Sequence, residues 1–225
     1  MSARTANVLL IAYAVVSAGH LVVQLAGPAW LSRPTQMLLM PLLAAWLWCA
    51  AAERTRLVRI AVVALAFSWL GDSLPVAFTG DAAFLAMVAG FLAAQVGYSL
   101  AFWPYRRGSV ARTPWTGLYV VAFAVLFGLC APGAGEMLVP VAVYGGCLTL
   151  MAVLATGVGR LAGIGGAVFF CSDALIALSA FADWYDPPVG GFWVMLTYLA
   201  GQVLLAAGVL RRVRSDAATG DAVRG

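Results

Sequence analysis

The chain has 225 residues, of which 64% are hydrophobic and only 10% are charged. A soluble domain has about 25% charged residues, and a single core could not hide this much apolar surface. The net charge of +4 does not indicate nucleic-acid binding, because the basic residues lie between apolar segments and form no continuous patch. The composition therefore predicts an integral membrane protein.

Apolar segments long enough to cross a bilayer core of roughly 30 Å recur along the whole sequence. They predict an all-α bundle of eight spans in one domain over residues 1–210. A short polar tail follows over residues 211–225, which we expect to be cytoplasmic, with the part after Arg214 disordered. The predicted spans cover about residues 8–25, 36–52, 58–78, 82–103, 115–131, 137–156, 163–181 and 190–210.

The arginines predict the orientation of these spans. With eight spans, twelve of the thirteen basic residues fall on the side that holds both chain ends, and Arg33 alone falls on the other side. Cytoplasmic loops are enriched in arginine, so both termini are predicted to be cytoplasmic. We expect a multi-pass protein of the cell membrane, in a bacterium the inner or plasma membrane.

Short motifs recur in the two halves of the chain, at about residues 8–103 and 115–210. Gly-Asp-Ser-Leu at residues 71–74 resembles Ser-Asp-Ala-Leu at residues 172–175, and glutamine and tyrosine recur in the fourth and eighth predicted spans. A four-plus-four duplication would relate the halves by a pseudo-two-fold axis along the membrane normal. Short matches also arise by chance in Ala-rich sequences, so both interpretations stay open.

Asp72 and Asp173 are the two acidic residues, out of nine, that fall within predicted spans. An ionised carboxylate in mid-membrane costs on the order of 2.5–3.5 kcal/mol, so each needs a reason. Either each hydrogen-bonds a neighbouring helix and locks the bundle, or the two share a polar pocket. In such a pocket one carboxyl group stays protonated while the other is charged, which supplies a general acid and an anion together. Proton-coupled transporters use the same arrangement.

Other polar side chains could line this pocket. Gln95 and Tyr98 lie three residues apart, and Tyr198 and Gln202 lie four apart, so each pair shares one helix face. For the glutamines, interhelical hydrogen bonding and pocket lining are both open. Arg33 is either an interfacial arginine or an anchor for a phosphate or carboxylate at the pocket mouth.

The sequence predicts no metal site and no cofactor. His20 is the one histidine, and a single histidine is more typical of a structural hydrogen bond than of a catalytic base. The four cysteines are scattered through apolar segments without a CxxC pair, which favours small buried side chains over a zinc site or a disulfide.

Taken in order, these motifs resemble the YhhN/TMEM86 family of lysoplasmalogenase-like membrane proteins. The similarity covers about residues 33–205, with one or more motifs per predicted span from the second onward, except the fifth. Two positions depart from the family pattern: Arg33 replaces a lysine, and Gln95 replaces a histidine and cannot carry a proton at neutral pH. The matching residues are Arg33-Pro34, Gly71-Asp72-Ser73-Leu74, Gln95 with Tyr98, Tyr144 with Met151, Ser172-Asp173-Ala174-Leu175, and Tyr198 with Gln202.

The resemblance implies hydrolysis of the vinyl-ether bond of lysoplasmalogens, without a cofactor, to a fatty aldehyde and a glycerophospho-base. This reaction begins with protonation of the β-carbon and passes through an oxocarbenium ion, as glycosidase reactions do. Asp72 and Asp173 would be the acid and the anion, with the assignment between them open. The hydrocarbon chain would enter sideways between helices. The residues that would bind this lysophospholipid-like substrate are Arg33, at the phosphate, and Gln95, Tyr98, Tyr144, Tyr198 and Gln202.

Two other classes of function stay open at this point. A proton-coupled transporter of a small molecule or lipid would use the aspartates as a proton relay, and it would show coupled flux without aldehyde release. A non-catalytic lipid-binding or structural membrane protein would need the aspartates for stability alone. The sequence does not predict the oligomeric state.

Overall fold

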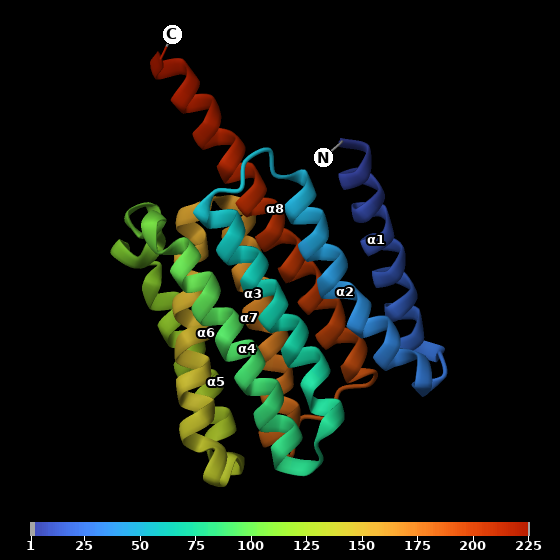
Figure 1. Ribbon diagram of the computed structural model, residues 1–225. Helices are drawn as coiled ribbons and strands as arrows, with labels where there is room; N and C mark the ends of the chain where they lie inside the picture. The colour runs from blue at the N-terminus through green and yellow to red at the C-terminus, as the bar shows by residue number, and fades with distance from the viewer. Residues whose placement is uncertain (1–2, 225) are drawn as a thin grey trace.

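The computed structural model describes residues 3–224 as one helical bundle, with no β-strand in that range. The all-α class is therefore confirmed. The helices run up and down beside one another, and the connections lie at the two ends of the bundle (Figure 1). They are α1 (Ala3–Ala26), α2 (Ala29–Ala50), α3 (Arg56–Ser73), α4 (Gly80–Phe102), α5 (Thr116–Ala134), α6 (Leu138–Val158), α7 (Arg160–Phe181) and α8 (Gly190–Arg224).

Short 3-10 helices occupy several of the connections. Proline lacks a backbone N–H, so Pro75 cannot continue the hydrogen bonding of α3, which ends at Ser73, one residue after Asp72. Asp72 therefore lies in the last turn of α3, and this end of α3 lies near the lower end of the bundle in Figure 1. The 3-10 helices are η1 (Leu74–Ala77), η2 (Trp103–Gly108), η3 (Val110–Arg112) and η4 (Gly135–Met137).

Six helical segments in the described part of the chain are long and apolar enough to cross a membrane, as expected for an integral membrane protein. Each predicted span lies on one α-helix, but the two counts differ. The segment Thr116–Val158 contains both α5 and α6, which η4 joins without a break. Helix α2 does not reach the same hydropathy, because Arg33, Thr35 and Gln36 lie in its first half. Eight spans, the repeat and the orientation stay predictions.

Glycines bring two helix pairs into close contact. Gly90 of α4 faces Gly71 of α3, where an added Cβ would lie 2.4 Å from the Gly71 nitrogen. Gly201 of α8 faces Phe169 of α7, where an added Cβ would lie 2.9 Å from the Phe169 nitrogen. Small residues let the backbones of membrane helices approach in this way. These contacts fix α3 on α4 and α7 on α8, beside the segments that contain the two buried aspartates.

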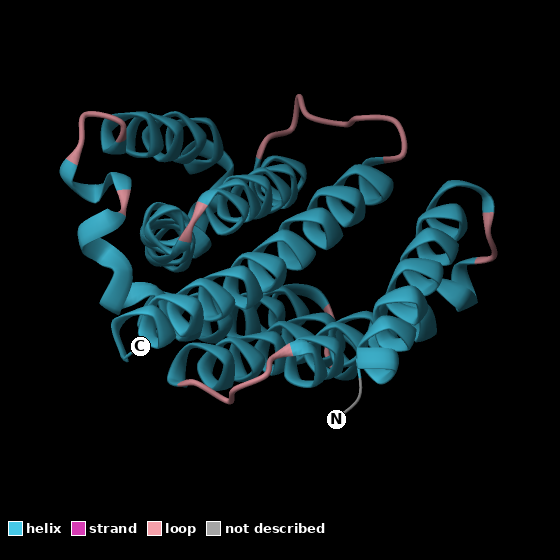
Figure 2. Cartoon of the chain, turned by 90° about the horizontal axis from the view of Figure 1, so that it is seen from above, coloured by secondary structure: helices cyan, strands magenta, loops and turns pink. Residues whose placement is uncertain are grey.

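The two edges of the bundle are packed differently (Figures 1 and 2). Helix α1 lies at one edge and packs against α2 and α8, whereas α5 lies at the other edge and packs against α6 and α7. Helix α4 packs against α3 and α6. Within the described residues, no backbone contact joins α4 to α5. Any contact between α4 and α5 in this range therefore involves side chains alone.

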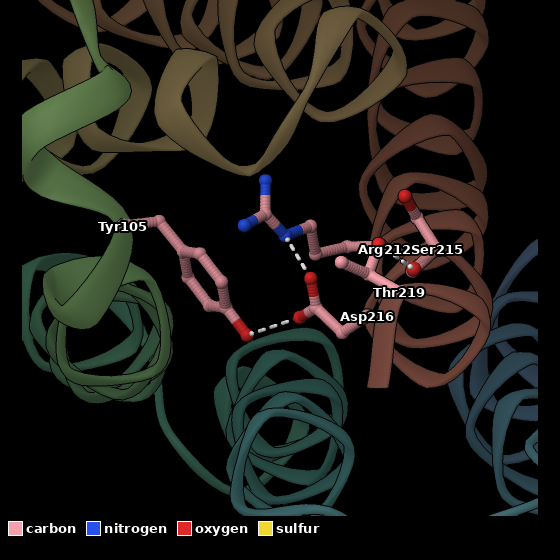
Figure 3. Close-up of polar contacts among 5 residues, drawn as sticks. All are labelled: Tyr105, Arg212, Ser215, Asp216 and Thr219. Atoms are coloured by element: carbon pink, nitrogen blue, oxygen red, sulfur yellow. Dashed lines mark hydrogen bonds and ion pairs between the residues drawn. The ribbon is translucent and has the colours of Figure 1, made fainter. Parts of the chain in front are cut away.

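The expectation of a disordered tail is wrong for the part that the structure describes, because α8 continues to Arg224. Arg212 and Asp216 lie one turn apart, with Nε 2.9 Å from Oδ1, and such pairs stabilise helices. The Tyr105 hydroxyl donates to the other Asp216 oxygen over 3.2 Å (Figure 3). The Arg212 guanidinium lies 4.5 Å from the centre of the Tyr105 ring. These contacts attach the extension of α8 to η2.

Candidate active site

Asp72 accepts one hydrogen bond on each of its carboxyl oxygens. Gln36 of α2 donates from Nε2 to Oδ1 over 2.8 Å, and the Tyr198 hydroxyl of α8 donates to Oδ2 over 2.8 Å. The side chain is 5% exposed. A charged carboxylate accepts hydrogen bonds on both oxygens, and these two donors supply that arrangement from two different helices.

Asp173 accepts both of its hydrogen bonds on one oxygen. The Tyr144 hydroxyl of α6 and Nε2 of Gln95 on α4 donate to Oδ2 over 2.6 and 3.2 Å. Within the described residues, Oδ1 receives no hydrogen bond. The other amide atom of Gln95, Oε1, is buried there without a partner. One carboxyl oxygen of Asp173, Oδ2, is therefore fixed by two donors, whereas Oδ1 has no hydrogen bond there.

Both aspartates line one cavity of about 410 Å³. Asp72 and Asp173 lie close enough for electrostatic interaction, and so do Arg33 and Asp72. Arg33 is exposed at the edge of this cavity. The polar lining consists of Arg33, Gln36, Asp72, Ser172, Asp173 and Tyr198, and apolar side chains of α4, α7 and α8 complete the wall.

A second, apolar cavity of about 50 Å³ adjoins the first. It lies among α4, α5, α6 and α7, and Asp173 is the one acidic residue in its lining. Because the two cavities share wall residues, Asp173 lies where the polar space meets the apolar one. The shared residues are Phe84, Met87, Phe91, Asp173 and Ile176.

A third, more open cavity of about 540 Å³ leads from the polar cavity toward the α7–α8 connection. Its wall includes Phe84, Ile176, Val194 and Met195, which also line the polar cavity. On its far side lie Tyr185 and Asp186, in the connection between α7 and α8. The polar cavity thus adjoins a cavity at the α7–α8 connection, and that connection lies near the lower end of the bundle in Figure 1.

The structure places Tyr98 and Gln202 together, but not in the wall of the aspartate cavity. The Tyr98 hydroxyl donates to Oε1 of Gln202 over 2.9 Å, and Nε2 of Gln202 donates to the Ser68 hydroxyl over 3.0 Å. All three side chains are completely buried. They join α3, α4 and α8 one turn from Tyr198, so they support the cavity without lining it.

Sequence reasoning missed Gln36, which binds Asp72 directly. A signal was available, because Gln36 lies three residues after Arg33 on one helix face and is polar within an apolar segment. His20 lies outside the site: its ring nitrogens are 2.8 Å from the Thr35 hydroxyl and 3.2 Å from Nε2 of Gln24. Within the described residues, no three His, Cys, Asp or Glu side chains are grouped for a metal ion.

Comparison with known proteins identifies the family of this chain. A model of the YhhN family matches residues 30–209. The chain is similar to the lysoplasmalogenase TMEM86B of Rattus norvegicus, with 31% identity over 193 residues that span 82% of this chain and 75% of the rat protein. No solved structure gives a significant match. The family match covers the helices that contain both aspartates and all their hydrogen-bond donors, and the chain belongs to the YhhN family.

Proposed function

We propose that this protein hydrolyses the vinyl-ether bond of lysoplasmalogens, or of a closely related ether lipid, inside the membrane. The observation that supports this most is the pair of buried aspartates in the wall of one cavity, beside a separate apolar cavity. A lysolipid has the same division, with a polar head group at one end and a hydrocarbon chain at the other. The similarity to the rat lysoplasmalogenase supports the same reaction.

The aspartates match what vinyl-ether hydrolysis requires. The reaction needs an acid that protonates carbon and an anion near the oxocarbenium ion that follows, a division of labour that two carboxyl groups perform in glycosidases. Asp72 and Asp173 face one space from two helices, so both can reach a substrate bound there. Their donors fix the orientation of each carboxyl group, as Tyr198 does for Asp72 and Tyr144 for Asp173.

Arg33 would bind the phosphate of the head group. It is exposed at the edge of the polar cavity, and arginine presents several N–H donors that match phosphate oxygens. The cavity volume of about 410 Å³ lies in the usual range for small-molecule sites. The glycerophospho part of a lysolipid would fill it, with the charged end toward the open third cavity.

Gln95 would position Asp173 instead of transferring a proton. The family pattern has a histidine here, but an amide does not ionise near neutral pH. Gln95 still donates a hydrogen bond to Asp173, which is the contact that a neutral histidine would also make. The proton transfers are thus assigned to the two carboxyl groups.

We also propose eight spans, with both ends in the cytoplasm, from a four-plus-four repeat. In such a repeat α2 corresponds to α6, α3 to α7 and α4 to α8. Asp72 of α3 is bound from α2 and α8, and Asp173 of α7 is bound from α6 and α4, which is the same pattern after this exchange. The pattern supports the repeat. With both ends in the cytoplasm, the polar cavity would lie toward the outer face of a cell membrane.

Aldehyde release from purified protein tests the proposed function. Lysoplasmenyl-ethanolamine is added in detergent or proteoliposomes, and aldehyde is measured for the wild type, Asp72→Asn and Asp173→Asn. Asp81→Asn is the matched control, because Asp81 lies in the first turn of α4 outside the three cavities described above. We expect both site variants to lower turnover by about 10²–10⁴-fold and the control to retain it. No aldehyde from the wild type would contradict the proposal, and proton-coupled flux in the same vesicles would favour a transporter.

A further inference from the structure

The apolar cavity has the properties of a binding site for one hydrocarbon chain. Its wall contains aromatic and aliphatic side chains from α4, α5, α6 and α7, with few polar groups that could bind a head group. Phe84 of α4 and Phe181 of α7 lie edge to face at one end, with ring centres 5.4 Å apart. Phe123 and Phe127 of α5 line another part of the wall. An alkyl chain would find only apolar contacts there, apart from Asp173 and Tyr144.

A route for a lipid chain from the bilayer to this cavity would pass between α4 and α5. Residues of both helices line the cavity, and the two helices make no backbone contact within the described part of the chain. A lysolipid would therefore keep its head group in the polar cavity while its chain passes between α4 and α5 into the membrane interior.

The order of the groups in the substrate then fixes which aspartate is the acid. A vinyl ether reads, from the chain inward, as alkyl carbon, β-carbon, α-carbon, ether oxygen and glycerol. With the chain in the apolar cavity and the phosphate at Arg33, the β-carbon lies at the junction, where Asp173 is. Resting on the proposed function, we propose that the apolar cavity binds the alkenyl chain, so that Asp173 is the proton donor and Asp72 the anion.

The hydrogen bonds of the two carboxyl groups agree with these roles. Asp72 accepts a donor on each oxygen, as a charged carboxylate does. Asp173 has both donors on Oδ2, so Oδ1 is left to hold a proton and to face the cavities. A proton on Oδ1 needs no rearrangement of Tyr144 or Gln95, because both of them bind Oδ2.

Each step of the reaction can be balanced with these two groups. Protonated Asp173 gives its proton to the β-carbon while the double-bond electrons form the new C–H bond, and the ether oxygen shares a lone pair to give the oxocarbenium ion. Water adds to the α-carbon and its proton goes to Asp72. The hemiacetal then collapses: its hydroxyl proton returns to Asp173, the bond from the α-carbon to the glycerol oxygen breaks, and Asp72 protonates that oxygen. The net reaction consumes one water molecule and restores both aspartates.

Chain-length preference tests the binding site for the chain. Val141 of α6 lines the apolar cavity, whereas Val143, two residues on, is 51% exposed on another face. Val141→Phe is compared with Val143→Phe on lysoplasmenyl-ethanolamines with decenyl and octadecenyl chains. We expect Val141→Phe to lower the kcat/KM ratio of the long to the short chain by about tenfold, and Val143→Phe to leave it unchanged. Equal ratios in both variants, with normal wild-type turnover, would overturn the chain site but not the proposed function.

The assignment of the acid is tested by deuterium labelling. In D₂O the aldehyde gains one deuterium beside its carbonyl, on a single face if an enzyme group delivers it, and immediate reduction to the alcohol preserves the label. We expect Asp72→Asn to be slow but to keep single-face labelling, and any product from Asp173→Asn to be labelled on both faces. If Asp173→Asn gives no product, Asp173→Glu must restore labelled turnover. Single-face product from Asp173→Asn, or no rescue by Asp173→Glu, would overturn the assignment.

Discussion

The two buried aspartates differ in how their hydrogen bonds are distributed. Asp72 lies at the end of α3, where the Gly71–Gly90 contact brings α3 against α4, and each of its oxygens has a donor. Asp173 lies within α7, beside the apolar cavity that α4 and α5 both line, and only one of its oxygens has a donor. The two side chains are equally buried, at 5% and 6% exposed, so the difference lies in their hydrogen-bond donors and not in their burial. A carboxyl group with a donor on each oxygen suits a stable charge, and one with an unbonded oxygen suits a group that gives up a proton.

The largest effects are expected from the aspartates, singly and together. Each Asn variant should lower kcat by about 10²–10⁴-fold, because one carboxyl group of the acid–anion pair is lost. Groups that act as one unit are not additive, so the double variant should be about as slow as the slower single variant. Steady-state aldehyde release measures all three. Losses that multiply in the double variant would show that the two aspartates act independently.

The next largest effect separates the two tyrosines. Tyr198→Phe leaves Oδ2 of Asp72 without its donor, whereas Tyr144→Phe leaves Oδ2 of Asp173 still bound by Gln95. A hydrogen bond to a charged group is worth about 1.5–3 kcal/mol, so Tyr198→Phe should lower kcat by roughly 10–100-fold. Tyr144→Phe should lower kcat by much less than Tyr198→Phe does. The opposite order would mean that Asp173, not Asp72, is the charged group.

A glycine variant tests the tight packing beside Asp72. Gly90→Val puts a side chain against the backbone of α3 and should destabilise the protein by about 1–3 kcal/mol. Gly128→Val on α5 is the matched control, because an added Cβ there meets nothing within 4 Å. Thermal unfolding in detergent compares the two. Equal unfolding temperatures would argue against close contact of α3 with α4.

Arg33 should affect binding more than chemistry. Arg33→Gln removes the positive charge at the edge of the polar cavity, so KM should rise by about tenfold with little change in kcat. Arg33→Lys keeps the charge and should restore most of the binding. A change in kcat alone would place Arg33 near the reacting bond instead of the phosphate.

The smallest effect is expected far from both aspartates. Asp216→Asn removes a partly exposed ion pair with Arg212 at the other end of α8 (Figure 3). Exposed pairs contribute at most about 1 kcal/mol, so stability should change little. Aldehyde release should be unchanged. A large loss of turnover would mean that this end of α8 influences the site.

The sequence was sufficient to predict the membrane class, the all-α fold and the unusual position of Asp72 and Asp173. Those inferences need only the local composition of each segment. A carboxyl group within an apolar segment can be recognised from the sequence, however the helices pack. It could not show that Gln36 binds Asp72, or that Tyr98 and Gln202 bind each other. Such pairs join helices far apart in sequence, so they depend on how the helices pack. The helical continuation of α8 was not predicted, because a polar segment with few apolar residues is typical of an unstructured region.

The missing contact between α4 and α5 also bears on how the purified protein will behave. If the alkenyl chain passes between α4 and α5, acyl chains of neighbouring lipids would fill that space whenever no substrate is bound. The substrate would then have to displace these acyl chains in order to bind. Alkyl tails of a detergent would occupy the same space between α4 and α5 when the protein is extracted from the membrane. Long-chain detergents should then act as competitive inhibitors, and the apparent affinity for substrate should depend on the tail length of the medium in which it is measured.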